Sequence, residues 1–156
     1  IAVRKISSLP ILRKDFIFDE IQVYESRAIG SDCILIIMAA LTDNEAECIE
    51  KKAIELGMDV ILEIHNQKEL ERALLLNSKL IGINNRDLNS FTTDLNTTAN
   101  LIKFIPDDYL VISESGISTK DDIKFIMDFE VNSFLIGENF MKSNNIEQEF
   151  LKLLDI

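Results

Sequence analysis

The chain has 156 residues, of which 47% are hydrophobic, and its net charge is −11. This length is enough for one sizeable core and favours a single domain over residues 1–156. The acidic balance argues against binding to nucleic acid, because phosphate backbones select surfaces rich in Lys and Arg.

Other classes of protein are disfavoured by what the sequence does not contain. No window approaches the roughly 20 apolar residues of a membrane span, and the opening IAVRKISSLP has no apolar core of a signal peptide. We interpret Cys33 and Cys48 as reduced packing residues of a cytoplasmic protein, since neither has a metal-type spacing partner. With a single histidine, His65, and no carboxylate cluster, no metal is expected.

Six short apolar runs are predicted to be strands. Each run is continuous rather than alternating, which is typical of parallel strands buried on both faces. The runs are residues 9–12, 33–38, 60–62, 80–83, 110–112 and 134–136.

Longer amphipathic stretches separate these runs and are predicted to be helices. Gly30 is a good C-terminal cap for the first, and Thr42 with Glu45 forms a capping-box pattern at the start of the second. The predicted helices are residues 19–30, 42–57, 66–76, 97–105, 119–129 and 146–154.

The strict alternation predicts an α/β fold with a parallel sheet and right-handed crossovers. Two architectures fit this pattern: an open, doubly wound sheet, and a piece of a (β/α)₈ barrel. A whole barrel takes about 250 residues. About six β/α units are present here, so a barrel would be incomplete by about two units.

Polar residues collect directly after the apolar runs. In a barrel the carboxyl ends of the strands meet at one mouth, where barrel enzymes have their active sites. We therefore expect these residues to gather at such a mouth, although polar loops are common in any fold. They are Lys14, Glu63, Asn84, Arg86, Glu114, Ser115 and Glu138. Four of them, Lys14, Glu63, Asn84 and Arg86, are expected to point inward around a shared cavity.

Two of these positions suit proton transfer. A lysine such as Lys14 in a partly desolvated mouth can act as a general acid or hold an anion. Glu63 follows an apolar triplet, so its carboxylate suits acid/base work, while the alternative is a partner for a helix N-terminus. His65 is predicted to begin a helix or face solvent, without a catalytic role.

Gly116 and Gly137 follow the last two predicted strands. At the corresponding loops of a barrel, glycine lets backbone N–H groups approach a phosphate. The alternative is that both are turn glycines, and we favour phosphate binding.

Five blocks of the sequence together resemble the indole-3-glycerol-phosphate synthase family. They are LPILRKDFI (9–17), ILEIH (61–65), GINNRDL (82–88), SESGI (113–117) and LIGE (135–138). The resemblance covers almost the whole chain and maps its runs to strands three to eight of a (β/α)₈ TIM barrel.

The resemblance implies a reaction of tryptophan biosynthesis without a cofactor. The family closes the ring of 1-(2-carboxyphenylamino)-1-deoxyribulose 5-phosphate and releases CO₂ and water. By position, Lys14 matches the general acid and Glu63 a carboxylate that transfers protons in the dehydration. The remaining matches are Asn84 in catalysis, Arg86, Glu114 and Ser115 in substrate binding, and Gly116, Gly137 and Glu138 in phosphate binding.

The family also has a first-strand block resembling E-[FY]-K-x-x-S-P-S, which this sequence lacks. We expect the chain alone to be inactive, because the members of a catalytic set act as a unit. We also expect it to be oligomeric or molten, because unpaired sheet edges pair with other chains. A missing N-terminal segment or self-association would cover such an edge. The alternative functions are a phosphoribosylanthranilate isomerase and a non-catalytic remnant that binds phosphorylated ligands or a partner segment.

Overall fold

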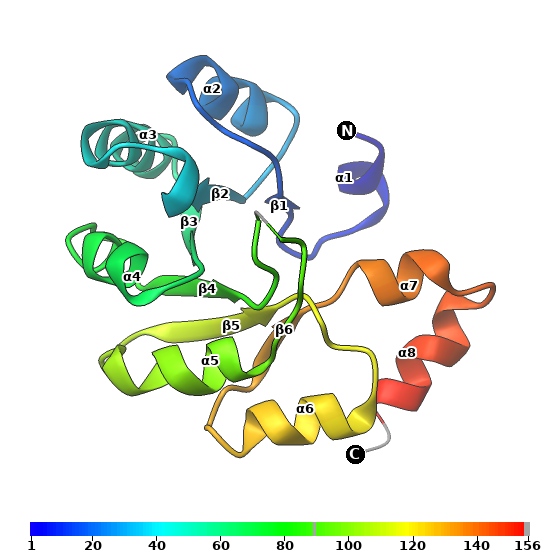
Figure 1. Ribbon diagram of the computed structural model, residues 1–156. Coiled ribbons are helices and arrows are strands. Elements are labelled where there is room, and N and C mark those ends of the chain that lie inside the picture. Colours follow the sequence, from blue (N-terminus) through cyan, green and yellow to red (C-terminus); the bar gives the residue numbers. More distant parts are fainter. Residues whose placement is uncertain (89, 155–156) are drawn as a thin grey trace. The chain divides into compact units, whose positions relative to one another are not determined.

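The computed structural model describes residues 1–88 and 90–154, which form six strands with helices between them (Figure 1). A strand lies at or beside each of the six predicted runs. The strands are β1 (Leu12–Arg13), β2 (Cys33–Ile37), β3 (Asp59–Ile64), β4 (Leu80–Asn84), β5 (Leu110–Glu114) and β6 (Ser133–Leu135).

The order of the strands decides between the two predicted architectures. In the sheet they follow one another in chain order, β1-β2-β3-β4-β5-β6. A doubly wound sheet reverses its strand order at a switch point, whereas each strand of a (β/α)₈ barrel lies beside its neighbours in the chain. The fold is therefore an incomplete (β/α)₈ barrel, as predicted.

The chain divides into two compact units. The first contains residues 1–64 and 68–81, and the second contains residues 65–67 and the chain from Gly82 onward. In the first unit, β2 pairs in parallel with both β1 and β3, and the register places Ile37 beside Glu63.

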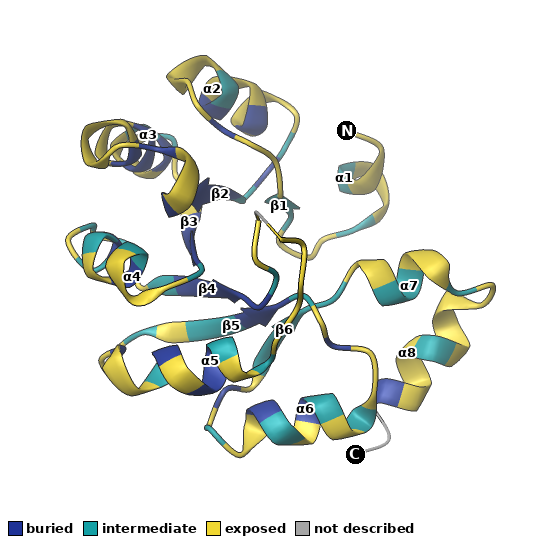
Figure 2. Ribbon diagram, in the orientation of Figure 1, coloured by how far each residue is buried: buried dark blue, intermediate teal, exposed yellow. Residues whose placement is uncertain are grey.

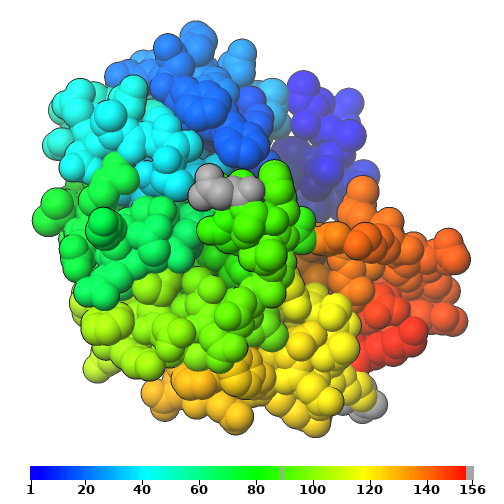
Figure 3. Space-filling view, in the orientation of Figure 1, coloured from blue at the N-terminus to red at the C-terminus, as the bar shows by residue number. Residues whose placement is uncertain are grey.

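Continuous burial explains why these sequences form strands. Every residue of β2 and of β3 except the first is buried, whereas the two longest helices of this unit are buried on one face only (Figure 2). Helix α2 (Glu20–Ala28) and helix α3 (Asp43–Glu55) pack side by side at the surface (Figure 3). Helix α4 (Gln67–Ala73) leads from β3 to β4.

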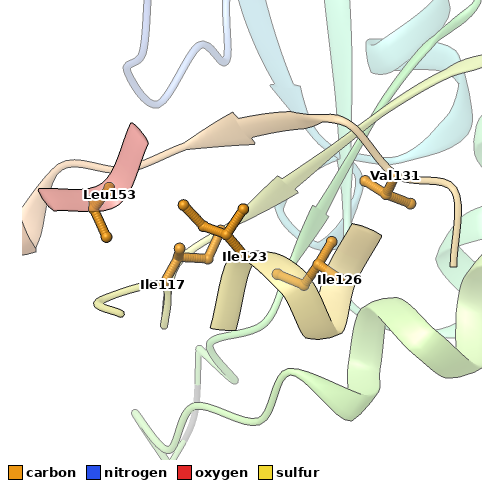
Figure 4. Close-up of a cluster of buried hydrophobic side chains, with 5 residues drawn as sticks. All are labelled: Ile117, Ile123, Ile126, Val131 and Leu153. Atoms are coloured by element: carbon orange, nitrogen blue, oxygen red, sulfur yellow. The ribbon is translucent and has the colours of Figure 1, made fainter. Parts of the chain in front are cut away.

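In the second unit, β5 and β6 pair in parallel. This unit also has its own cluster of buried apolar side chains. Ile123 and Ile126 of helix α6 (Lys120–Met127) pack with Ile117, Val131 and Leu153 (Figure 4). Leu153 belongs to helix α8 (Ile146–Leu154), so the cluster fixes α8 to the unit. Helix α5 (Asn96–Leu101) continues into a 3₁₀ turn, η2 (Ile102–Phe104).

Helix starts were predicted better than the first strand. Thr42 and Glu45 form the predicted capping box of α3, and Asp19 caps α2 in the same way. Gly30 follows α2 with φ +96°, a left-handed conformation that glycine adopts without strain. The first strand was predicted as residues 9–12 but covers only Leu12–Arg13.

Three short elements were not predicted. Helix α1 (Ala2–Ile6) has no buried residue, helix α7 (Glu138–Lys142) has five residues, and the 3₁₀ turn η1 (Met38–Ala40) takes the last residue of the predicted second strand. Elements this short, or without a buried face, leave no hydrophobic period in the sequence.

Candidate active site

Lys14 and Glu63 form an ion pair in the first unit, although they lie 49 positions apart. Lys14 follows β1, Glu63 lies in β3, and the lysine side chain reaches past β2 to place Nζ 2.8 Å from Oε2. The Glu63 side chain is 2% exposed and that of Lys14 is 39% exposed. A buried carboxylate therefore holds an ammonium group that water and a ligand can reach.

The position of Glu63 differs in one detail from the prediction. It was predicted to follow the strand, but β3 continues to Ile64 and includes it. His65 was predicted to begin a helix or to face solvent. Instead it lies in the bend before α4 and is half-buried.

Asn84 and Arg86 lie at the end of β4 in the second unit. The side-chain oxygen of Asn84, which is buried, accepts a hydrogen bond of 3.0 Å from the backbone N–H of Arg86. Asn84 thereby fixes the first residue of the loop that presents the guanidinium group. The Nε of Arg86 is buried and has no hydrogen-bond partner among residues 1–88 and 90–154.

The Arg86 guanidinium group forms an ion pair with Glu138, the first residue of α7. Glu138 also accepts a hydrogen bond of 2.6 Å from Lys142 Nζ. The bonds from Lys142 and Arg86 lower the pKa of the Glu138 carboxyl group below its usual range. Two residues predicted to serve different parts of the substrate are thus in contact with each other.

Glu114 and Ser115 lie at the end of β5. Glu114 is fully buried, including both carboxylate oxygens, and Ser115 is half-buried. Ser115 has φ +66° and Gly116 has φ +78°, so two successive residues are left-handed. For a serine this conformation is strained, and such strain is common at functional sites.

The two predicted phosphate-loop glycines differ in how strongly the structure requires glycine. A Cβ at Gly116 would lie 2.4 Å from the Thr93 side chain, a clash in addition to the strain of its positive φ. Gly137, which precedes α7, has φ −118° and open space around an added Cβ. Of these two positions, only 116 therefore requires glycine, because of its backbone conformation and its neighbours.

Sequence reasoning missed a buried polar network beside these residues. The side chain of Asn85 bonds to Thr98, to Ser113 and to the backbone carbonyl of Ser115. The only available signal was that Asn85 belongs to the GINNRDL block and Ser113 to SESGI.

Among the residues that the structure describes, neither a metal cluster nor a long apolar helix is found. Residues 1–88 and 90–154 contain no group of three or more His, Cys, Asp or Glu side chains that could hold a metal ion. Within the same residues, no helix is long and apolar enough to cross a membrane.

Comparison with known proteins decides the family. The family model described as "Indole-3-glycerol phosphate synthase" matches residues 1–153. The chain belongs to the indole-3-glycerol phosphate synthase family. The resemblance of the five sequence blocks is thereby confirmed.

Relatives named indole-3-glycerol phosphate synthase are similar along most of this chain. The protein from Alkaliphilus metalliredigens is 45% identical over 151 residues, which are 97% of this chain and 58% of the relative. That from Polaromonas naphthalenivorans is 52% identical over 137 residues, or 88% of this chain and 52% of the relative. The chain thus spans little more than half the length of the curated relatives it matches.

Solved structures of distant sequence share the fold. KGPDC from Streptococcus mutans superimposes with a TM-score of 0.72 at 14% identity, covering 98% of this chain and 74% of the other. A mandelate oxidase mutant gives a TM-score of 0.74 at 14% identity, covering 94% of this chain and 56% of the other.

Proposed function

We propose that this chain supplies the catalytic lysine and glutamate of an indole-3-glycerol-phosphate synthase. Its substrate would be 1-(2-carboxyphenylamino)-1-deoxyribulose 5-phosphate, and its products indole-3-glycerol phosphate, CO₂ and water. The hydrogen bond of 2.8 Å between Lys14 Nζ and Glu63 Oε2 carries the proposal. A cytoplasmic location and the absence of a cofactor are part of it.

The pair suits the proton transfers that this reaction requires. When the aromatic carbon attacks the ribulose carbonyl carbon, the carbonyl oxygen gains negative charge, and the Lys14 ammonium group can donate a proton to it. Loss of CO₂ then restores the aromatic ring. The hydroxyl group formed from the carbonyl oxygen departs as water when it receives a second proton and the new five-membered ring loses one. Glu63 takes part in this dehydration and holds Lys14 in place through their shared bond.

The residues of the second unit have binding roles in this proposal. Asn84 takes part in catalysis, Arg86 binds substrate through its guanidinium group, and Glu114 and Ser115 line the mouth. The phosphate would be held by the backbone at Gly116 and Gly137 and by the loop of Glu138. Because Glu138 already neutralises Arg86, substrate binding requires Arg86 to share or exchange this partner.

Turnover would be tested in a fusion protein. The part of the Alkaliphilus metalliredigens relative that precedes the matched segment is placed before residue 1, and product is followed by fluorescence. Lys14→Met and Glu63→Gln should each reduce kcat by about 100-fold or more, the usual contribution of a general acid or base. Lys51→Met is the control, since Lys51 is exposed on α3.

Each outcome separates the candidate functions. Turnover that is lost in both variants and kept in the control supports the synthase. Binding of indole-3-glycerol phosphate without any turnover would favour a non-catalytic protein that binds phosphorylated ligands. Neither binding nor turnover in a folded fusion would overturn the proposal.

A further inference from the structure

We propose that Asn85 is a positioning residue that holds Ser115 in its left-handed conformation. This inference deepens the proposed function, because it concerns the loop that would carry Glu114, Ser115 and Gly116 to the substrate. Asn85 lies between Asn84 and Arg86 in the chain, and it has no role among the predicted site residues.

The side chain of Asn85 uses all of its hydrogen-bonding capacity inside the protein. It is 2% exposed, and its Oδ1 accepts from Thr98 Oγ1 at 2.8 Å and from Thr98 N at 3.2 Å. Its Nδ2 donates to Ser113 Oγ at 3.0 Å and to the carbonyl oxygen of Ser115 at 3.1 Å. An amide group offers two donors and two acceptor sites, so none is left over.

One arrangement of protons satisfies the three side chains together. Asn85 Nδ2 donates to Ser113 Oγ, the Ser113 hydroxyl donates to Thr98 Oγ1 at 2.9 Å, and the Thr98 hydroxyl donates to Asn85 Oδ1. Reversing the amide would place Oδ1 against the Ser115 carbonyl oxygen, where two acceptors repel. The Ser115 carbonyl oxygen and the Thr98 backbone N–H therefore fix which end of the amide faces Ser115, and the ring of hydroxyl groups fits this orientation.

The bond to Ser115 falls where the backbone is strained. Ser115 has φ +66°, and a non-glycine residue in the left-handed region costs roughly 1 kcal/mol or more, so surrounding contacts must impose it. Asn85 supplies two such contacts, because its backbone N–H also donates to the Glu114 carbonyl oxygen at 2.9 Å. The left-handed backbone at Ser115 sets the directions of the Ser115 side chain and the Gly116 N–H.

Asn85 also connects two loops of the second unit that carry predicted site residues, the loop after β4 and the loop after β5. Through its backbone it fixes Asn84 and Arg86 on one side, and through its amide it fixes Glu114 to Gly116 on the other. Ser113 and Thr98 are fully buried, so water cannot replace a lost bond at low cost. A loop positioned by such a network is preorganised before any ligand arrives.

The test separates the donor and acceptor halves of the amide. Asn85→Asp keeps Oδ1 for Thr98 but removes both donor bonds, whereas Thr98→Val removes the hydroxyl bonds and leaves Nδ2 facing Ser115. The φ angle at Ser115 and Gly116 is followed by three-bond H–N to Hα couplings and backbone carbon shifts of the chain itself. Ile126→Val, in the core of the same unit, controls for a general loss of stability.

We expect Asn85→Asp to move the couplings at Ser115 and Gly116, and Thr98→Val and Ile126→Val to leave them unchanged. Ser115→Gly should remove the dependence on Asn85, because glycine adopts positive φ without help. In the fusion protein, Asn85→Asp should lower kcat while the control keeps it, and this loss should shrink in the Ser115→Gly background. Should Asn85→Asp prove unfolded, Asn85→Ala and Asn85→Ser provide the same comparison.

Unchanged couplings in folded variants would overturn the inference, as would equal kcat losses in Asn85→Asp and Ile126→Val. Failure of the proposed function looks different, since the fusion would then show no turnover while the couplings still respond to Asn85. A response of the couplings together with a kcat loss specific to Asn85 would support both.

Discussion

At the scale of single residues, the two cysteines should differ sharply in reactivity. Burial, reinforced by the Asp59 carboxylate, raises the pKa of the Cys33 thiol to about 12, whereas Cys48 is exposed on α3. At pH 8 only about 1 in 10,000 Cys33 thiols would be ionised, and the thiolate is the reactive species.

We therefore expect iodoacetamide at pH 8 to modify Cys48 and spare Cys33 in the folded chain, as measured by peptide mass spectrometry. The same reaction in concentrated urea should modify both and serves as the control. Equal labelling in the folded chain would contradict the raised pKa of the half-buried Cys33 thiol.

A buried carboxylate in the first unit should matter for stability rather than for function. Glu50 of α3 is fully buried and accepts hydrogen bonds from Asn77 N (3.0 Å), Asn77 Nδ2 (3.1 Å) and Ser78 N (2.7 Å). Glu50→Ala leaves these donors without an acceptor and should reduce the free energy of unfolding by about 3 kcal/mol. Urea unfolding measures the change.

Glu47→Ala is the matched control, because Glu47 lies on the same helix but is exposed. We expect it to change the free energy of unfolding by less than about 0.5 kcal/mol. Similar losses in the two variants would show that helix composition, and not the buried acceptor, is responsible.

The sequence predicted which residues of the site lie at strand ends or in blocks shared with the family, but not all of the contacts between them. Lys14 and Glu63 were expected to meet because both follow buried runs, and they do meet. The Arg86–Glu138 pair was not foreseen, since position along the chain does not fix which side chains turn toward each other. Asn85 was missed because a buried amide that is fully bonded looks like any loop asparagine in the sequence.

At the scale of elements, prediction succeeded wherever burial was continuous or periodic. The long apolar runs of β2 and β3 gave strands that are buried along almost their whole length. Helix α1 was not predicted because none of its residues is buried. The boundary of β1 was misplaced because residues 9–11 are apolar but do not belong to the strand.

The start of α3 gives a prediction with a defined pH dependence. The Thr42 hydroxyl donates to Glu45 Oε2 at 2.7 Å and the Thr42 backbone N–H donates at 2.8 Å, and these bonds lower the pKa of Glu45 below its ordinary value. A lowered folded-state pKa stabilises the fold above the ordinary carboxyl pKa, and this stabilisation is lost as pH falls through the folded value.

Thr42→Ala should therefore raise the pKa of Glu45 toward its ordinary value and cost about 1 kcal/mol through loss of the N-cap. Titration of the Glu45 side-chain carbonyl carbon by NMR measures the first effect, and urea unfolding at pH 7 the second. Asn44→Ala, two residues further along the chain, should leave the Glu45 titration unchanged. An unaltered pKa in Thr42→Ala would refute the capping box.

At the scale of the whole molecule, strand order was the feature that sequence patterns could not supply. Alternating strands and helices fit a doubly wound sheet as well as a barrel, because both bury parallel strands under helices. Only the sheet order β1 to β6, without a reversal, separates the two. That order depends on contacts between segments far apart in the chain, which hydrophobic period does not encode.

The first nine residues also expose several large apolar side chains. Ile1, Val3, Ile6 and Leu9 are all exposed, and Ile6 and Leu9 reach 87% and 71%. Exposed apolar side chains that gather into a large patch favour association. We expect the purified chain to self-associate with rising concentration, as measured by light scattering, and to bind a hydrophobic dye.

Changing Ile6 and Leu9 to lysine should shift the chain toward monomer, since the added charges must be desolvated to bury the segment. Leu75→Lys is the matched control: Leu75 is 81% exposed and follows α4, outside the N-terminal segment. An exposed apolar residue is ordinary on protein surfaces. If the unaltered chain is monomeric at all concentrations and binds no dye, this apolar segment is not a contact surface. If Leu75→Lys dissociates the assembly as well as the double variant does, net charge and not the segment controls association.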